Sequence, residues 1–283
     1  MTVSVVKLTD AIGAEIRGLD LSRPIDDADF AKAREAFYQH SVIVVRDHAF
    51  SDEDHIRFTA RFGELKHLPL KQFLLGSHPE IFVVSNIKKE GSYIGAHDAG
   101  VVWHSDGPFL DKPHGPAALH ALIVPKKDGK SLGDTRFAST IAAYDALPES
   151  RKKQFEGLRA VHSLNRRFKI GQNLGVSNSK VLTQGGDDTH AIHPLVQVHP
   201  HSGRKCLYVS EGYTTKIVGM PDDEAVPLIA ELAAHCVKPE FQYVHSWREH
   251  DLVMWDNVST QHKAAFDYEP QHRLMHRTTL LNP

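Results

Sequence analysis

The sequence predicts a mostly β fold, a β-sandwich or jelly roll with helices packed outside it. From about residue 80 onward, short runs of β-branched and aromatic residues follow one another at close spacing, as in antiparallel β proteins. Helical patterns are few and do not alternate evenly with these runs, so a doubly wound parallel sheet is not expected. The sequence also lacks a G-x-G-x-x-G motif, a P-loop and a G-x-S-x-G elbow, which argues against three common α/β enzyme folds.

The N-terminal part is predicted to combine strands with capped helices. A strand is expected over residues 3–8, and the segment 13–24 is rich in turn residues. Asp26 or Asp27 can cap a helix whose apolar residues recur at helical spacing up to Phe37. The short β-branched run that follows is predicted to be a buried strand.

A second capped helix is expected to begin after Ser51. Ser51 and Asp54 have the spacing of a capping box, and Gly63 ends the helical pattern. Two more helices are expected, one over about 139–156 and one after Pro221. The long irregular stretch 165–192 is rich in Gly, Asn and Ser and is predicted to be a lid or insert. Further strands are predicted at 41–47, 80–86, 101–104, 117–125, 134–139, 158–164, 195–200, 206–210, 240–247, 251–257 and 273–281.

Composition and charge exclude several function classes. The 283 residues contain no internal repeat and no low-complexity linker, so one domain over 1–283 is expected. Lys and Arg number 33 against 35 Asp and Glu, which predicts no nucleic-acid or membrane partner. No apolar run reaches the roughly 18 residues of a membrane span, and the first residues lack a signal-peptide layout, so a cytoplasmic protein is expected. The two cysteines, Cys206 and Cys236, match no metal or redox motif.

The strongest local chemical signal is the run Trp103-His104-Ser105-Asp106. Residues two apart in a strand point to the same face, so His104 and Asp106 would project together. An imidazole and a carboxylate supply two ligands of the 2-His-1-carboxylate triad of non-haem Fe(II) oxygenases, whose third ligand would come from elsewhere. The triplet H-x-D alone is weak, because a chain with 20 histidines contains such triplets by chance, and a polar surface pair is the alternative.

A second signal lies near the C-terminus. His262 follows the predicted strand 251–257 and a turn. Arg273, Met275 and Arg277 alternate on one face of the predicted last strand. Two arginines on an inner face would be costly without anionic partners, so a ligand that carries a carboxylate is expected there.

These motifs resemble those of the taurine dioxygenase / 2,4-dichlorophenoxyacetate dioxygenase family of Fe(II)- and 2-oxoglutarate-dependent dioxygenases. The resemblance covers nearly the whole chain and is far more specific than H-x-D alone. The matching segments include IGAEIRGLDLSRPI (12–25), RFGEL (61–65), WHSD (103–106), GDT (133–135), AAYDALP (142–148), LYVSEGYTTKIVGM (207–220) and WDN…TQH…HR (255–277).

The resemblance implies a double-stranded β-helix, a jelly-roll variant, with iron at its centre. His104, Asp106 and His262 would be the metal ligands and the catalytic centre. Three protein ligands on an octahedral ion leave room for 2-oxoglutarate and O₂. The enzyme would then release succinate and CO₂ and hydroxylate a small-molecule substrate. Relatives in the family commonly form dimers or tetramers, so a homo-oligomer is expected.

The resemblance also implies which residues bind the cosubstrate. Thr135 of the GDT motif and Arg273 would hold the distal carboxylate of 2-oxoglutarate. Arg277 would lie near both the cosubstrate and an anionic group of the substrate. An anionic substrate is therefore expected: a sulfonate, an alkyl sulfate or an aryloxyalkanoate. Hydroxylation next to the heteroatom would lead to C–S or C–O cleavage.

The expected substrate pocket departs from the pattern of the taurine enzyme. The family has a sulfonate-binding histidine shortly after FGEL, where this chain has Leu68, with His67 one position earlier. Gly107 replaces a valine, and its backbone N–H is available to a small anion. Phe168 and Tyr213 match aromatic pocket positions and would pack a small substrate. Taurine itself is therefore not the expected substrate.

Three other interpretations share part of the pattern. A biosynthetic hydroxylase or desaturase of an amino-acid-like metabolite would have the same ligands. A catalytically silent jelly-roll binding module would have no reason to keep residues at both ends of the cosubstrate site. A hydrolytic zinc enzyme would leave the paired arginines and the GDT motif without a role.

Several other polar residues are interpreted as structural. His199 and His201 are expected in a polar hairpin turn rather than a metal site, given Pro200 and Gly203. His276 is out of phase with Arg277 and should face away from the site, and His114 is expected to be a satisfied or surface histidine. The cations of the 165–192 stretch are expected on a solvated face, with a role in binding a substrate anion as the alternative: Arg166, Arg167 and Lys169.

Overall fold

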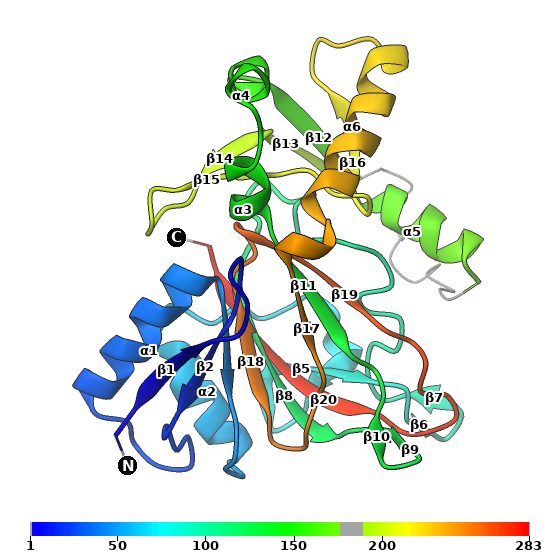
Figure 1. Ribbon diagram of the computed structural model, residues 1–283. Helices are drawn as coiled ribbons and strands as arrows, with labels where there is room; N and C mark the ends of the chain where they lie inside the picture. Colours follow the sequence, from blue (N-terminus) through cyan, green and yellow to red (C-terminus); the bar gives the residue numbers. More distant parts are fainter. Residues whose placement is uncertain (1, 176–188, 283) are drawn as a thin grey trace.

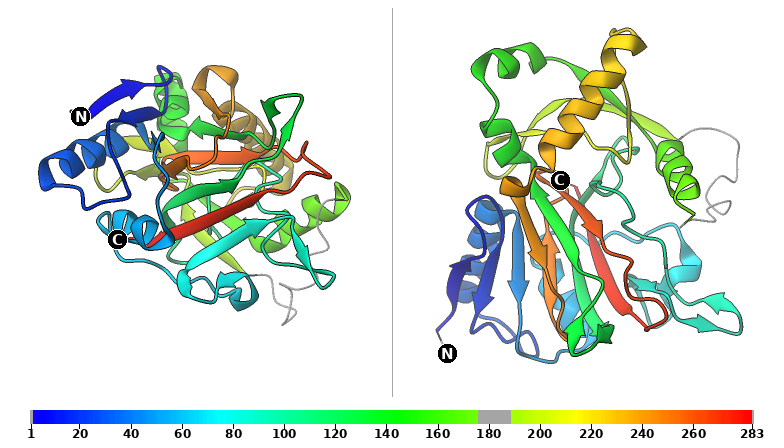
Figure 2. Two further views of the ribbon diagram at one scale, coloured as in Figure 1. Left: turned by 90° about the horizontal axis from the view of Figure 1, so that it is seen from below. Right: turned by 45° about the vertical axis from the view of Figure 1, so that its right-hand side comes forward.

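An eight-stranded sheet forms the largest layer of the protein (Figure 1). The computed structural model describes residues 2–175 and 189–282. Within the sheet, β20 lies between β8 and β5, as Figure 2 also shows. In spatial order the strands are β1 (Ser4–Lys7), β2 (Ala14–Arg17), β3 (Val42–Val45), β18 (Leu252–Trp255), β8 (His114–Ile123), β20 (Leu274–Leu281), β5 (His78–Ser85) and β4 (Leu74–Leu75).

A three-stranded sheet packs against the inner face of this large sheet. Its strands are β17 (Gln242–His245), β11 (Thr135–Ser139) and β19 (Thr260–Ala264). Phe137 of β11 shares one buried cluster with residues of the large sheet, such as Leu119, Val253 and Met275. Burial of apolar surface between two sheets is the main stabilising contribution in such a layered fold.

Two helices cover the other face of the large sheet. They are α1 (Asp27–His40) and α2 (Asp52–Ala60), and Phe30, Phe37 and Phe58 pack there against Ile43 and Met254. The predicted caps are confirmed, because Asp26 accepts from the backbone N–H of Asp29 and Ser51 forms a reciprocal capping box with Asp54.

The remaining elements pack mostly at one end of the two sheets (Figure 1). A third sheet contains β13 (His190–Pro194), β12 (Arg159–Ser163) and β16 (Thr214–Ile217). The helices are α3 (Thr140–Asp145), α4 (Glu149–Phe155), α5 (Leu164–Asn173) and α6 (Asp222–Cys236), with 3₁₀ turns η1 (Lys71–Phe73) and η3 (Pro239–Phe241). Short hairpins pair β14 (Val196–Val198) with β15 (Lys205–Leu207), β9 (Lys126–Lys127) with β10 (Lys130–Ser131), and β6 (Lys88–Lys89) with β7 (Ser92–Tyr93).

The predicted fold class is confirmed as mostly β with flanking helices, but several elements differ from the predictions. The turn-rich segment 13–24 contains β2, which pairs with β1 and β3, so pairing with distant strands outweighs local turn preference. The expected helix 139–156 is two helices, broken at Pro148, because proline disfavours helical geometry in the residue before it. The stretch 165–192 is not irregular throughout, because it contains most of α5 and the start of β13; its residues 176–188 lie outside the described part.

The expected strand 101–104 is wrong. Only His104 makes a β-bridge, which pairs it with His262 of β19. No helix in the described ranges combines the length and apolarity needed to cross a membrane.

Candidate metal and cosubstrate site

His104, Asp106 and His262 come together although no regular strand carries the first two. The backbone N–H groups of His104 and His262 each donate to the other residue's carbonyl oxygen, at 3.2 and 2.8 Å. The backbone N–H of Asp106 donates to Oδ1 of Asn257, at 3.0 Å. The loop that carries His104 and Asp106 is therefore fixed by one β-bridge and one side-chain hydrogen bond, and not by the strand expected at 101–104.

The three side chains form the one potential metal-binding group found among the described residues. Each offers a ligand atom, these atoms all lie within 4.8 Å of one another, and all three residues are buried. Nε2 of His104 lies 3.8 Å from Oδ1 of Asp106. The geometry therefore fits a divalent cation bound by two imidazoles and one carboxylate.

The protonation states of these residues also suit a metal. Nδ1 of His104 lies 2.8 Å from the carbonyl oxygen of Val102, which can only accept, so Nδ1 carries the proton and Nε2 keeps its lone pair. Burial, helped by His104, lowers the pKa of His262 to about 3. Burial also lowers the pKa of His104, although the carboxylate of Asp106 opposes this. Both imidazoles are therefore neutral at pH 7 and able to coordinate.

Asp106 is ionised in the same environment. Burial raises the pKa of Asp106, but the positive charge of Arg277, with smaller effects of His262 and His104 where these titrate, outweighs burial and holds this pKa well below its usual range. Oδ2 of Asp106 and Nδ1 of His262 are buried and have no hydrogen-bond partner among the described residues. Buried polar atoms normally have a partner, so an ion at this position would satisfy an otherwise costly arrangement.

Two arginines lie in the same cavity as the metal-binding group. Arg273 precedes β20 and is almost fully buried, and Nε of its guanidinium has no partner in the described structure. Burial lowers the pKa of Arg273, which a ligand carboxylate would offset. The cavity is lined by Val84, Ala99, Gly100, His104, Leu119, Thr135, Phe137, Trp255, His262, Ala264, Arg273 and Arg277.

Thr135 is prepared to donate a hydrogen bond into this cavity. Its Oγ1 accepts from the indole Nε1–H of Trp247 at 3.0 Å, so its own O–H remains for another acceptor. Thr135 stands opposite Ala264 on β19, two residues along that strand from His262. A carboxylate held between Thr135 and Arg273 would thus lie near the metal-binding group.

Arg277 links the large sheet to the metal-binding group. It stands on β20 opposite Leu119 of β8 and Phe82 of β5, and its Nη1 lies 3.4 Å from Oδ1 of Asp106. Its guanidinium also lies over the Phe82 ring, at 5.1 Å from the centroid. His276 faces away, as predicted, and Nδ1 of its ring lies 2.7 Å from Oδ1 of Asp52.

The structure brings only some of the expected pocket residues to the site. Tyr213 is buried with its ring centroid 6.1 Å from that of His104, and Phe168 is buried on α5. Gly107 directly follows Asp106 and has a left-handed backbone, with φ of +67°. Leu68 packs in the core cluster next to the cavity, whereas His67 is exposed and does not line the cavity as described.

Some residues were misjudged or missed by sequence reasoning. The solvated-face interpretation is wrong for Arg167, whose side chain is only 12% exposed and donates to the carbonyl oxygen of Asp98 at 2.7 Å. The hairpin at His199 is confirmed, but its ring is buried against Asp256, with Nε2–Oδ2 at 2.7 Å. Asn257 and Trp247 position the site, and only the motif WDN hinted at the first of them.

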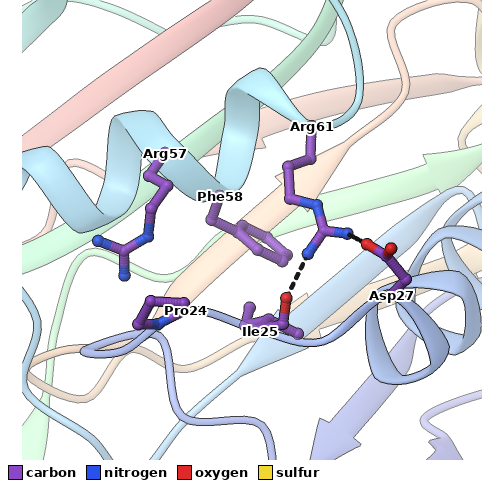
Figure 3. Close-up of a pocket in the computed structure, with 6 residues that line it drawn as sticks. All are labelled: Pro24, Ile25, Asp27, Arg57, Phe58 and Arg61. Carbon is purple, nitrogen blue, oxygen red and sulfur yellow. Dashed lines mark hydrogen bonds and ion pairs between the residues drawn. The ribbon is translucent and has the colours of Figure 1, made fainter.

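Another pocket lies at the surface between α2 and the segment before α1 (Figure 3). Its two arginines already have partners. Arg61 binds the carbonyl oxygen of Ile25 and the carboxylate of Asp27, and Arg57 binds the carbonyl oxygen of Leu21 and the carboxylate of Asp54. These satisfied cations leave little charge for a ligand, so the cavity at His104 remains the candidate site.

Comparisons with known proteins agree with this site. Residues 4–279 match the family described as "Taurine catabolism dioxygenase TauD, TfdA family". The chain is 31% identical to pentalenolactone F synthase of Streptomyces arenae, covering 90% of this chain and 88% of the relative. It is 31% identical to the alpha-ketoglutarate-dependent 2,4-dichlorophenoxyacetate dioxygenase of Cupriavidus pinatubonensis, covering 99% and 98%. It is 32% identical to an alkylsulfatase of Acinetobacter baylyi, covering 97% and 83%.

A solved structure gives the same result. The crystal structure of AAD-2 in complex with Mn(II) and N-oxalylglycine matches with a TM-score of 0.82 and 30% identity, covering 100% of this chain and 98% of that one. The match of family, full-length relatives and fold has one consequence: this chain belongs to the TauD, TfdA family and is an Fe(II)- and 2-oxoglutarate-dependent dioxygenase.

Proposed function

We propose that this dioxygenase hydroxylates a small anionic organic molecule, with His104, Asp106 and His262 as the iron ligands. The observation that carries the proposal is the arrangement of Arg273 and Arg277 in one cavity with His104 and His262, where Arg277 also contacts Asp106. One arginine serves the cosubstrate, and the other is left for the substrate. When bound, Fe(II) with 2-oxoglutarate and O₂ supplies the oxidising chemistry, which inserts one oxygen atom into a C–H bond and releases succinate and CO₂.

The protein's own residues bind and orient the reactants. Thr135 and Arg273 hold the distal carboxylate of 2-oxoglutarate by hydrogen bonds from a hydroxyl and a guanidinium. Arg277 keeps Asp106 ionised and offers its remaining donors to an anion. We assign Tyr213, whose ring lies 6.1 Å from that of His104, and the buried Phe168 of α5 to the substrate pocket, where they would exclude water.

The substrate classes we propose are sulfonates, alkyl sulfates and aryloxyalkanoates. Relatives of similar length are named for alkyl sulfate and 2,4-dichlorophenoxyacetate chemistry. In this chain Arg277 and the backbone N–H of Gly107 lie beside Asp106 and suit an anionic oxygen. A hydroxyl placed on the carbon next to an ether or sulfate oxygen gives an adduct that collapses to a carbonyl, so the C–O bond breaks and the heteroatom group leaves.

A second candidate is a biosynthetic oxidation of a metabolite that is not cleaved. The observation that favours it is the similarity to pentalenolactone F synthase. The same ligands and cosubstrate residues would serve both reactions. A substrate panel that includes amino acids and neutral metabolites separates them.

The architecture around the site forms part of the proposal. We propose that the eight-stranded and three-stranded sheets form a double-stranded β-helix within one domain that spans residues 1–283. A homodimer or homotetramer is expected, and light scattering of the purified protein will give its mass. We also expect a cytoplasmic location, which cell fractionation will test.

The first experiment is anaerobic titration of the apoprotein. Fe(II) and then 2-oxoglutarate should produce the visible charge-transfer band of a chelated keto acid, and His104→Ala should abolish it. Sulfonates, alkyl sulfates, aryloxyalkanoates and amino acids are then added, and the compound that shifts the band identifies the substrate class. Arg277→Gln should keep the band and weaken the shift caused by anionic compounds. Iron binding without a band would refute the roles of Thr135 and Arg273.

A further inference from the structure

A β-bulge at the start of β8 turns His114 toward the metal-binding group. Between Thr279 and Leu281 of β20, the partner on β8 moves from Ala117 to His114, so β8 has one extra residue there. Without that residue, His114 would lie on the outer face with Ala118 and His120, because side chains alternate along a strand. With the extra residue, His114 stands opposite Leu281, on the same face of the sheet as Thr279 and Arg277.

The ring of His114 occupies the space next to Gly107. A β-carbon added at position 107 would lie only 2.8 Å from Cδ2 of His114 and 3.1 Å from its Nε2. Contacts this short are not tolerated, and the φ of Gly107, +67°, also favours glycine. His114 thus takes the place of a side chain directly after the metal-binding residue Asp106.

Lys66 approaches the same place from the edge of β20. Its backbone N–H donates to the carbonyl oxygen of Thr279 at 2.7 Å, and Leu65 bridges to Leu280. Leu65 packs in the outer cluster, so the side chain of Lys66 alternates to the inner face. Burial is the main cause that lowers the pKa of His114; the carboxylate of Asp106 opposes it, and Lys66 and Arg277 both lie close enough to add to it.

The polar groups at this place lack partners. Nδ1 of His114, Oγ1 of Thr279 and Nε of Arg277 are all buried without a hydrogen-bond partner among the described residues. Burial lowers the pKa of Lys66, and no carboxylate of the described residues acts to raise it. Arg277 contacts the carboxylate of Asp106 at 3.4 Å, but its Nε is left over. Together with Lys66 and the two unpaired polar side chains, it suits an anion with several acceptor oxygens.

We propose that His114 and Lys66 bind the anionic head group of the substrate beside Arg277, and so determine substrate specificity. This inference rests on the proposed function, because it assigns residues to the substrate of the same site. The ligand chemistry is an organic oxyanion, in which sulfate, sulfonate and carboxylate share acceptor oxygens. In this proposal His114 donates one hydrogen bond from its ring, and Lys66 supplies a positive charge.

The test measures equilibrium binding rather than turnover. Enzyme loaded anaerobically with Fe(II) and 2-oxoglutarate is titrated by calorimetry with hexyl sulfate, hexanesulfonate, hexanoate and the neutral 1-hexanol. His114→Phe fills the same space but cannot donate, and His114→Gln keeps a donor. Lys66→Met removes the charge but keeps the chain length. His201→Ala, at the exposed hairpin turn, is the matched histidine control.

We expect His114→Phe and Lys66→Met to weaken binding of the best anionic probe by about tenfold or more, since a buried hydrogen bond to a charged group has this magnitude. His114→Gln should stay within about threefold of the wild type, and His201→Ala should not differ from it. The charge-transfer band and the affinity for 2-oxoglutarate should be unchanged in all variants. The preferred probe tells whether the head group is a sulfate, a sulfonate or a carboxylate.

Two results would overturn the inference while leaving the proposed function intact. One is unchanged probe affinity in both His114→Phe and Lys66→Met. The other is loss of the charge-transfer band in every His114 and Lys66 variant, which would show that these residues only support the fold. A wild-type protein that forms no band would instead refute the proposed function itself.

Discussion

The side-chain oxygen of Asn257 accepts a hydrogen bond from the backbone N–H of Asp106, so the loop after β18 holds a metal-binding residue in place. The same oxygen accepts from the indole N–H of Trp255, and the amide of Asn257 donates to the carbonyl oxygen of Gly115 at 2.7 Å. One buried amide therefore joins the loop of Asp106 to β18 and β8.

Asn257→Ala should lower the affinity for Fe(II). Loss of a group that orients a ligand typically costs about 10- to 100-fold in metal affinity. The variant also leaves buried donors unpaired, at about 1–3 kcal/mol each in unfolding free energy. Metal titration and urea unfolding measure the two effects. Asn257→Asp keeps the acceptor and should retain tighter metal binding than Asn257→Ala; equal affinities in the two variants would contradict this role.

Thr135→Val should weaken 2-oxoglutarate binding by about tenfold or more, because it removes the hydroxyl without changing the size of the side chain. It also leaves the indole N–H of Trp247 without its acceptor. The titration midpoint of the charge-transfer band measures the effect, and Thr135→Ser should restore most of the affinity. Metal affinity should not change, and a parallel loss of metal would argue for general damage to the site.

The stability of the protein should fall in mild acid because of His120. This ring is fully buried, stacks on Phe50 with centroids 3.9 Å apart, and has no hydrogen-bond partner for either nitrogen among the described residues. Burial, followed by the nearby His250 and His276, lowers the pKa of His120 to about 4.

In the unfolded chain His120 binds a proton near pH 6.5, whereas in the folded protein it does so only near pH 4. The contribution of the neutral ring to the unfolding free energy is therefore complete above pH 6.5 and is lost as the pH falls toward 4. Linkage gives a loss of about 2 kcal/mol in unfolding free energy at pH 5 relative to pH 8. His120→Phe keeps the stacking and should reduce this dependence, which urea unfolding at both pH values will measure. His250→Ala, at a more exposed neighbour, serves as the comparison. An unchanged pH dependence in His120→Phe would assign the acid sensitivity to other groups.

Both thiols should be unreactive in the folded protein. Cys206 and Cys236 are fully buried, and burial raises the pKa of Cys206 to about 12 and that of Cys236 further. A thiol reagent at pH 8 should therefore label neither residue until denaturant is added. Labelling of the native protein at the rate seen for the unfolded chain would show that this part of the structure opens readily.

The sequence predicted which side chains form the site more accurately than it predicted the backbone structure that carries them. Two arginines predicted in phase on the last strand needed anionic partners, and the structure places both in the cavity with His104 and His262, although Arg273 precedes β20. The alternation rule led to the correct pairing of His104 with Asp106, but through a strand that does not exist. Their proximity comes from Asn257 and from a bridge to β19, which are contacts between distant segments and leave no periodic pattern.

The position of His114 likewise could not be predicted from strand alternation. Strand alternation alone places it on the outer face, and one extra residue in β8 reverses this. A bulge depends on how two strands pair, so the residues of β8 alone could not reveal it. Similarly, β2 lies in a segment of turn residues because β1 and β3 pair with it on either side.

The hydrogen bonds of Asn257 have a consequence for the loss and reloading of the metal. They hold the backbone of Asp106 through groups of the protein alone, and the bridge between His104 and His262 does the same for the backbone of these two residues. Hydrogen bonds within the protein therefore support the backbone of each residue that would bind the metal. We therefore expect a chelator to remove iron without unfolding the chain, so that added Fe(II) restores the site.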